Sequence, residues 1–505
     1  MKRVQAVNVG SRKHLLFDDA LIAERRGFDL RMNPAVRSEE PVVVPDRPWE
    51  TAGIMGDSGA TVLQDGGEYK LWYSVVVPGS SSSAQPGRKS ALTPAEMRTL
   101  DKKTLLDYLS DSSYMLCYAT SRDGVHWEKP DLGIFAFAGS KKNNIVMVGP
   151  YGGTVFRDPT APRGQRYKMI TGTGPKMPHT HLDTDIPTYA AYRSIYGACS
   201  ADGIHWRFHE KPVLPWYTDT TNVCYWDDRI RKYVAFVRWD ETMYYRNGRT
   251  FRRLGDFYRA VGQSVSRDFC RFPPPKNILE PAPEDLRPAW KRYEIYNSSA
   301  IKYPFAADSY FMFPVYYHPR PEVSDIHLAT SRDGAHYARW RDPFLGLGPA
   351  GAFDSHMVHM ATGVVRNGDE LNMYYVGVNY LHDIRTYPAA AGGIGRARVR
   401  LDGFVSQDAR WTGGSLTTLP LRFSGRTLTL NMDASAGGCL QVEILDATGR
   451  PIPGFTRKET DRLWGNDVRK KATWNGKGDI AALRARVIRL RFIGRGVKLY
   501  AFQFV

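Results

Sequence analysis

Apolar and polar residues alternate along most of this chain with the two-residue period of a half-buried β-strand. Runs such as YMLCYAT (114–120) and DIHLAT (325–330) end at a short polar motif, and its first copy, at 121–127, reads SRDGVHW. Related versions occur at 199–206, 264–272, 329–337 and 398–404, most of them followed by another strand-like run. Each copy therefore predicts a strand, a tight turn and a second strand.

The residues of the motif suit a tight turn. Its aspartate can accept hydrogen bonds from backbone N–H groups two residues on, its glycine can take a positive φ, and its aromatic residue can pack back on the strands. The aspartates of the five copies are Asp123, Asp202, Asp268, Asp333 and Asp402. They follow one another at intervals of roughly 65 to 80 residues, which is the signature of a repeated structural unit.

A second pattern precedes each turn motif: a first strand, a polar turn and a second strand. It begins near residues 61, 154, 222, 300 and 362. Together with the turn motif it gives four strands per unit, as in a blade of a β-propeller. The sequence therefore predicts an all-β protein whose residues 1–412 form a five-bladed β-propeller.

The first unit is interrupted at 78–113. A stretch rich in Ser, Gly and Pro is followed by TPAEMRTLDKKTLLDYL, which starts like a helix, with Thr as N-cap and Pro at the first helical position. We expect a helical loop insertion there. After Trp411 the repeat ends, and residues 413–505 read as short alternating strands separated by turn signals, which predicts a C-terminal antiparallel β-sandwich.

Composition narrows the function classes. Of the 505 residues 12% are aromatic, and the formal net charge is +17. Lys and Arg are dispersed rather than clustered, and no nucleic-acid-binding motif accompanies them, so we expect a basic surface or an acidic partner such as an anionic polysaccharide, and no nucleic acid. No run approaches the roughly 18 apolar residues of a membrane span, so no membrane partner is expected either.

Neither a metal nor a cofactor is expected. The five cysteines are widely spaced and fit buried free thiols. His179, His181, Asp183 and Asp185 lie close together in MPHTHLDTD but lack a third ligand at a fixed spacing, so we interpret them as surface residues of an insertion. The N-terminus has no apolar core of a secretory signal, which predicts a cytoplasmic protein or one whose leader has been removed. The sequence leaves the oligomeric state open.

Five four-stranded units with Ser-x-Asp-Gly turns, followed by a sandwich, resemble the five-bladed propeller glycoside hydrolases, the group that holds families 32, 43, 68, 117 and 130. The architecture is most similar to family 32, although the Asn-Asp-Pro-Asn signature and the Glu-Cys pair of that family do not occur here. Arg157, Asp158 and Pro159 copy another triplet of family 32. In the repeat, however, Asp158 falls where Asp65 and Asp227 fall, which favours a hairpin turn.

The resemblance implies hydrolysis of a glycosidic bond in an oligo- or polysaccharide by two carboxyl groups. Such chemistry needs one protonated carboxyl as acid and one ionised carboxylate as base or nucleophile. Innermost strands converge on a propeller axis, so we expect the site where they begin. Asp57 and Asp219 stand there in the first and third units, each eight residues before its turn aspartate. We assign Asp57 as base or nucleophile, and either Glu294 or Asp219 as acid.

Aromatic, basic and polar residues near the same strand starts are expected to bind the sugar, because aromatic faces stack on sugar rings and Arg and His donate to hydroxyls. The candidates are Trp49, Arg238, Tyr296, His318, Asp354, His356 and His382. Two other functions stay open. A propeller can bind glycan without cleaving it, and sialidases carry similar turns, with Arg238, Arg246 and Arg259 as candidates for binding a sialate.

Overall fold

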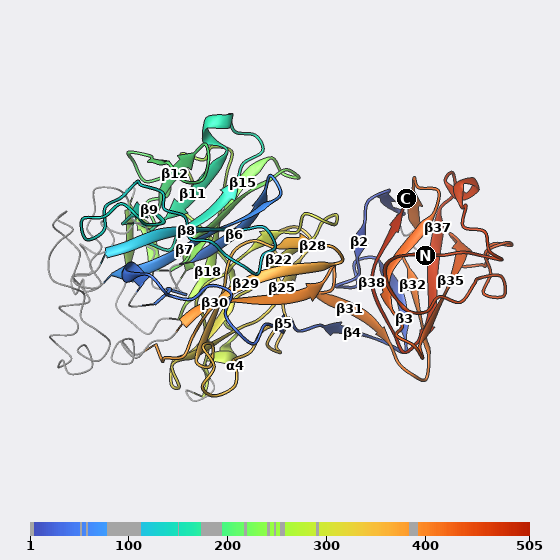
Figure 1. The fold of residues 1–505 in the computed structure, drawn as a ribbon. Coiled ribbons are helices and arrows are strands. Elements are labelled where there is room, and N and C mark those ends of the chain that lie inside the picture. Colours follow the sequence, from blue (N-terminus) through green and yellow to red (C-terminus); the bar gives the residue numbers. More distant parts are fainter. Residues whose placement is uncertain are drawn as a thin grey trace.

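The computed structural model describes residues 5–50, 53–56, 59–77, 113–149, 151–172, 194–216, 220–239, 243–246, 249–252, 258–288, 292–382 and 392–505. Strands dominate these ranges, and the only α-helix within them is the four-residue α4 (Pro283–Leu286). Short 3-10 helices also occur, among them η1 (Pro48–Glu50), η2 (Arg163–Gln165) and η4 (Ala481–Leu483). The predicted all-β class is confirmed (Figure 1). The expected insertion at 78–113 lies outside the described residues except for its last residue, which begins a strand.

Four sheets have four strands each in the order that the repeat predicts. The first contains β6 (Ala60–Asp65), β7 (Glu68–Val77), β8 (Ser113–Ser121) and β9 (Ile145–Val148), and the second contains β10 (Thr154–Arg157), β11 (Tyr167–Thr171), β12 (Tyr196–Ser200) and β13 (Trp206–Phe208). The third contains β14 (Val223–Asp227), β15 (Lys232–Trp239), β18 (Ala260–Ser266) and β19 (Lys276–Leu279), and the fourth contains β21 (Ile301–Lys302), β22 (Tyr310–Met312), β25 (Ala329–Ser331) and β26 (Ala338–Arg339). A separate hairpin, β16 (Met243–Arg246) and β17 (Arg249–Arg252), lies between β15 and β18 in the chain.

The fifth unit belongs to a larger sheet of eight strands. Its members are β20 (Glu294–Ile295), β23 (Val315–His318), β24 (Val323–Ile326), β27 (Met357–Met360), β28 (Val365–Asn367), β29 (Glu370–Val378), β30 (Gly392–Arg400) and β5 (Val36–Arg37). β5 comes from the start of the chain and pairs antiparallel with β30, Arg37 opposite Ala397. A strand from the N-terminal region therefore completes the last repeat.

The turn motif folds as its residues predict. Asp123 accepts from the N–H groups of Val125 and His126 at 2.8 Å, and Gly124 has a φ of +74°. The copies at Asp202 and Asp333 repeat these bonds, and Asp268 accepts one from the N–H of Cys270. The copy at Asp402 differs, because its carboxylate is buried and binds three side chains from distant parts of the chain.

Tyrosine side chains connect neighbouring four-stranded sheets. Each tyrosine binds the aspartate at or just after the end of the first strand of the preceding sheet in the chain. The hydroxyl of Tyr233 donates to Asp158 at 2.6 Å, that of Tyr310 to Asp227 at 2.8 Å, and that of Tyr167 to Asp65. Asp158 also binds the buried ammonium group of Lys168. The prediction of a hairpin turn at Asp158 is therefore confirmed, and its side chain is occupied by contacts between sheets.

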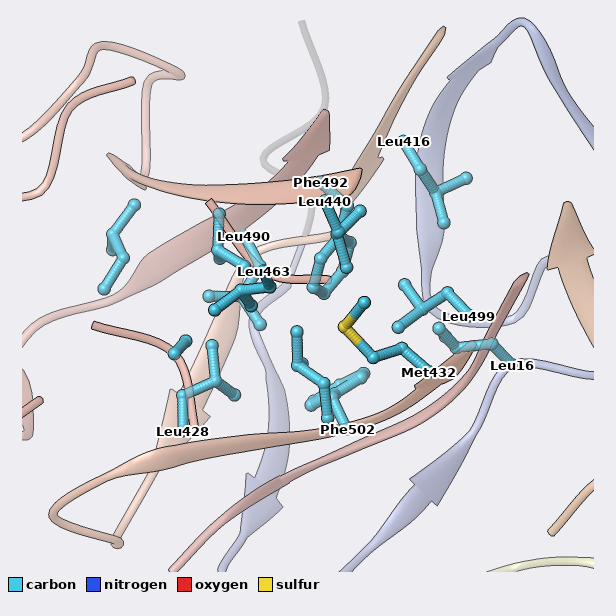
Figure 2. Packing of buried hydrophobic residues seen from close by; sticks show 14 of the residues in the cluster. Leu16, Leu416, Leu428, Met432, Leu440, Leu463, Leu490, Phe492, Leu499 and Phe502 are labelled. Atoms are coloured by element: carbon cyan, nitrogen blue, oxygen red, sulfur yellow. The ribbon is translucent and has the colours of Figure 1, made fainter. Parts of the chain in front are cut away.

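Two six-stranded sheets form the rest of the structure. One contains β1 (Val7–Gly10), β33 (Leu421–Phe423), β37 (Ile488–Arg495), β32 (Gly414–Thr418), β3 (Ile22–Arg26) and β35 (Cys439–Asp446). The other contains β36 (Asn466–Lys471), β34 (Leu428–Asp433), β38 (Val497–Phe504), β31 (Val405–Ala409), β4 (Phe28–Met32) and β2 (His14–Leu15). Side chains from both sheets, among them Leu440 and Phe492 from the first and Met432 and Phe502 from the second, share one buried cluster (Figure 2).

The strand pairing extends these two sheets beyond the expected range of 413–505. Figure 1 shows the blue strands β2, β3 and β4 among the orange and red ones. β1 pairs parallel with β33, and β3 pairs antiparallel with β32. The sequence predicts a boundary after residue 412, with these sheets formed by residues 413–505 alone. Four N-terminal strands and β31 also belong to them. Local periodicity marks a strand but not a partner that lies some 400 residues away in the sequence.

Candidate active site

Segments that precede the first strands of different units lie against one another. A Cβ on Gly56 would stand 2.6 Å from the ring of His359. A Cβ on Gly59 would stand 3.2 Å from the carbonyl oxygen of Gly153 and from the methyl group of Thr221. A Cβ on Gly56 would require the ring of His359 to shift, and Gly59 has a φ of +86°, which favours glycine. The first, second, third and fifth units therefore meet where the sequence predicts the site.

Asn297, just before the fourth unit's first strand, joins this group. Its Nδ2 lies 3.3 Å from Oγ1 of Thr221 and 3.4 Å from Nδ1 of His359, and all three residues are buried. Its Oδ1 has no hydrogen-bond partner among the described residues. The contacts of Asn297 form a polar layer that links three units. Buried polar groups are normally hydrogen-bonded, so the unpaired Oδ1 is an exception.

Glu294 is bound by two guanidinium groups. Its Oε2 accepts from Arg259 at 2.6 Å, and its Oε1 accepts from Arg292 at 2.7 Å. The carboxyl group is almost wholly buried, with 4% of the side chain exposed. Both oxygens of the carboxyl group are therefore occupied by charge-assisted hydrogen bonds, which are shorter and stronger than neutral ones.

Tyr296, two residues further on, lies between basic groups and a histidine. Its hydroxyl is 3.1 Å from Nε2 of His382, and the guanidinium carbons of Arg238 and Arg259 lie 4.8 and 5.1 Å from its ring centroid. The ring of Tyr317 lies 4.7 Å from that of His382. The structure thus brings together four predicted site residues: Arg238, Glu294, Tyr296 and His382.

His359 connects this cluster to the polar layer. Its ring contacts Tyr296 edge to face, with centroids 5.9 Å apart. Burial lowers the pKa of His359 from 6.5 to about 3, and His382 adds a smaller effect in the same direction. His359 is therefore a neutral imidazole at neutral pH and can accept or donate a hydrogen bond without charge.

This burial predicts an acid-dependent loss of stability. Below pH 6.5 the imidazole of His359 takes up a proton in the unfolded chain but stays neutral in the folded chain. The contribution of the buried imidazole to the free energy of unfolding is therefore complete above pH 6.5 and falls as the pH is lowered towards 3. The free energy of unfolding should drop by about 1.4 kcal/mol per pH unit in this window. Urea denaturation at pH 7 and pH 5 should show a smaller difference for His359→Gln than for the wild type. His336→Gln, at an exposed turn, is the control, and equal pH dependence in all three proteins would contradict the assignment.

The other predicted binding residues lie elsewhere. Trp49 is 6% exposed, packs edge to face on Phe137 and donates to Asn144, and this burial favours packing over sugar stacking. Asp354 is also buried and binds Arg37 at 3.0 Å and Tyr375 at 2.8 Å. Its carboxylate therefore ties β5 to the fifth unit.

His318 and His356 bind partners other than Tyr296. His318 lies 3.7 Å from Asp325, and His356 binds Ser355 at 2.9 Å. His318 and His327 together hold the pKa of Asp325 down at about 2, although burial acts to raise it. Asp57 and Asp219 lie outside the described residues, as does the set from His179 to Asp185.

Three members of the site had no clear signal in the sequence. Arg292 lies two residues before Glu294, Asn297 three residues after it, and Tyr317 pairs with Glu294 across β20 and β23. The NSS segment at 297–299, between β20 and β21, could have suggested a polar layer, because three consecutive small polar residues stand in a segment that is buried. The partners of these residues come from other units, which no local pattern predicts.

A cavity of about 780 Å³ is lined by residues in or next to the first strands of all five units. Its lining includes Trp226, Lys302 and Phe305 together with Arg12 from the N-terminal segment. None of the predicted site residues lines it. Among the described residues no group of three His, Cys, Asp or Glu side chains could hold a metal ion, and no helix there is long and apolar enough to cross a membrane.

No family model matches the chain, and no curated protein matches it. Solved structures do. They include a β-1,2-mannobiose phosphorylase from Listeria innocua (14% identity, 74% of this chain and 97% of that one, TM-score 0.46) and an N-acetylgalactosamine deacetylase from F. plautii (12%, 74% and 96%, 0.43). Another belongs to the family 130 mannoside phosphorylases, which contain glycoside hydrolases that target β-1,2 mannosidic linkages (15%, 77% and 97%, 0.41). Glycoside phosphorylases and hydrolases are thus among the solved structures to which the chain is similar.

Proposed function

We propose that this chain is a glycoside hydrolase that cleaves a glycosidic bond in an oligo- or polysaccharide, on a closed five-bladed β-propeller with a β-sandwich. Closure is supported by contacts between the first and fifth units. The N–H of Val62 donates to the carbonyl oxygen of Thr362 at 2.9 Å, and the hydroxyl of Tyr374 donates to the carbonyl oxygen of Gly124 at 2.8 Å. A closed ring of blades leaves only short, protected sheet edges.

One observation carries the proposal for the reaction. Gly59 and Thr221, which contact one another, each stand two residues after a predicted catalytic carboxylate, Asp57 and Asp219. In the sequence, each of the two carboxylates thus stands two residues before a contact between the first and third units. Asn297 joins Thr221 to the segment of Glu294 and Tyr296. This supports a pair of carboxyl groups beside an aromatic and basic surface, as glycoside hydrolysis needs.

Within the pair, we assign Asp57 as base or nucleophile and Asp219 as general acid. A general acid must carry a proton in the ground state. Both carboxyl oxygens of Glu294 are occupied by hydrogen bonds from Arg259 and Arg292. Glu294 is therefore better suited to orient Arg259 over the ring of Tyr296 than to protonate a leaving group.

The test is a panel of oligo- and polysaccharides incubated with the full chain, with the products separated by chromatography. We expect release of free sugar from at least one substrate. An arm with inorganic phosphate distinguishes hydrolysis from phosphorolysis, because phosphate attack would give a sugar phosphate. Binding to a glycan without any release would support the non-catalytic alternative. Release restricted to sialosides would support the sialidase-like one.

A further inference from the structure

Two tryptophans in the C-terminal sheets face solvent. Trp411 is 68% exposed and Trp464 is 58% exposed, whereas the other strongly exposed large hydrophobic residues of the described chain are Val and Ile. Trp474 shows the usual behaviour, because it is buried and its indole donates to the carbonyl of Val442 at 2.8 Å. Trp411 and Trp464 add little to the core, so packing does not explain them.

Both tryptophans border the same loop, residues 434–438. A Cβ on Gly437 would stand 3.2 Å from the ring of Trp411, and one on Gly496 would stand 2.8 Å from it, so the indole packs against both glycines. Next to Trp464, the N–H of Gly465 donates to the carbonyl oxygen of Ser435 at 3.2 Å, and the carbonyl oxygen of Gly465 accepts from the N–H of Ala434 at 2.9 Å. We call Trp411, Trp464 and this loop the tryptophan face.

Two arginines flank the tryptophan face. Arg495 directly precedes Gly496, and Arg462 alternates with the buried Leu463, so that it is exposed on the same side of the backbone as Trp464. Neither guanidinium has an ion-pair partner in the described part of the chain. The surrounding sheets are basic as well, since residues 413–505 contain 16 Arg and Lys against 7 Asp and Glu.

We propose that the tryptophan face is a second, non-catalytic binding site for an anionic polysaccharide with carboxylated sugars. A flat indole stacks on the apolar face of a pyranose ring. An exposed guanidinium can bind a carboxylate with two parallel hydrogen bonds, which a neutral sugar does not offer. The alternation of aromatic and cationic groups therefore matches a chain of uronic acids. The site would hold the enzyme on a polymer independently of the predicted active site.

Affinity gel electrophoresis of the full chain in polygalacturonate tests this proposal, with neutral dextran as the second probe. We expect retardation by polygalacturonate, little by dextran, and weakening as salt is added. Trp411→Ala with Trp464→Ala should lower the affinity roughly tenfold. Arg462→Gln with Arg495→Gln should lower it and reduce its dependence on salt. Arg486→Gln, at an exposed arginine before β37, is the matched control and should behave as the wild type.

Three outcomes would overturn the proposal. The wild type could migrate identically with and without polygalacturonate, or the Arg486 control could lose as much affinity as the double variants, which would indicate nonspecific charge attraction. The tryptophan variants could convert a dimer to a monomer in size-exclusion chromatography, which would make the face a contact between two copies. Melting temperatures check folding, and the single tryptophan variants replace the double one if it unfolds. Binding is measured without cleavage, so the result is separate from that of the hydrolysis assay.

Discussion

Replacing Asp57 by Asn should lower the rate of glycoside cleavage by about 10²- to 10⁴-fold, the range for loss of a positioned acid or base. Asn has the shape of Asp but cannot take a proton from water or form a stable glycosyl ester. The loss should appear in kcat, with a smaller change in KM, because the carboxylate acts mainly in the transition state. Initial rates on the best substrate of the panel provide the measurement.

A comparison with Asp219→Asn separates the two proposed roles. An aryl glycoside with a good leaving group needs no protonation, so the Asp219 variant should retain much of its rate on that substrate, whereas the Asp57 variant should lose activity on both. Asp131→Asn removes an exposed carboxylate of the first unit and should leave both rates unchanged. Full activity of the Asp57 variant would remove Asp57 from the mechanism. Full rescue of that variant by the aryl glycoside would exchange the two roles.

The turn motif shows what the sequence predicts well. The hydrogen bonds of Asp123 join residues two and three places apart in the sequence. The spacing of Asp, Gly and the aromatic residue is therefore enough to predict the geometry of the turn. The same holds for Asp158, whose position in the repeat predicted a hairpin turn. Its partner Tyr233 belongs to another sheet and could not be read from the motif.

The site residues show where this reasoning ends. Arg238, Tyr296 and His382 are aromatic or basic residues near a strand start, and the structure brings them together. Trp49 met the same criterion but packs on Phe137 inside its own unit. Residue type and order along the chain do not say which side of a short segment faces a neighbouring sheet, and that decides between stacking on a sugar and packing in a core.

Asp402 lies where three parts of the chain meet. It occupies the position of the turn aspartate in the fifth copy of the motif, but its side chain is fully buried. It accepts from Lys13 at 2.7 Å, from Tyr303 at 2.8 Å and from Asn431 at 3.1 Å. These residues belong to the N-terminal segment, the fourth unit and the C-terminal sheets. One carboxylate thus ties the repeats to the two six-stranded sheets.

Replacing Asp402 by Ala should therefore lower the free energy of unfolding by about 3–5 kcal/mol, because it leaves the ammonium group of Lys13 and two polar groups without their shared acceptor. Part of the loss comes from the backbone, since Asp402 has a φ of +64°, which Ala tolerates poorly. Asp402→Asn keeps this conformation and one acceptor oxygen, so the difference between the two variants measures the backbone cost together with the hydrogen bonds that the amide retains. Urea denaturation followed by tryptophan fluorescence and circular dichroism provides the values.

A double variant tests whether the charge of Lys13 is what makes the loss large. Lys13→Met removes the ammonium group, and in that background Asp402→Asn should cost about 1–3 kcal/mol less than it does in the wild type, because no buried charge is left unpaired. Lys13 is mostly buried, with 18% of its side chain exposed, so solvent screens the pair only in part. Equal costs in both backgrounds would show that Tyr303 and Asn431, rather than the ion pair, account for the stability. In that case the junction would depend on neutral hydrogen bonds, and raising the salt concentration should leave it unchanged.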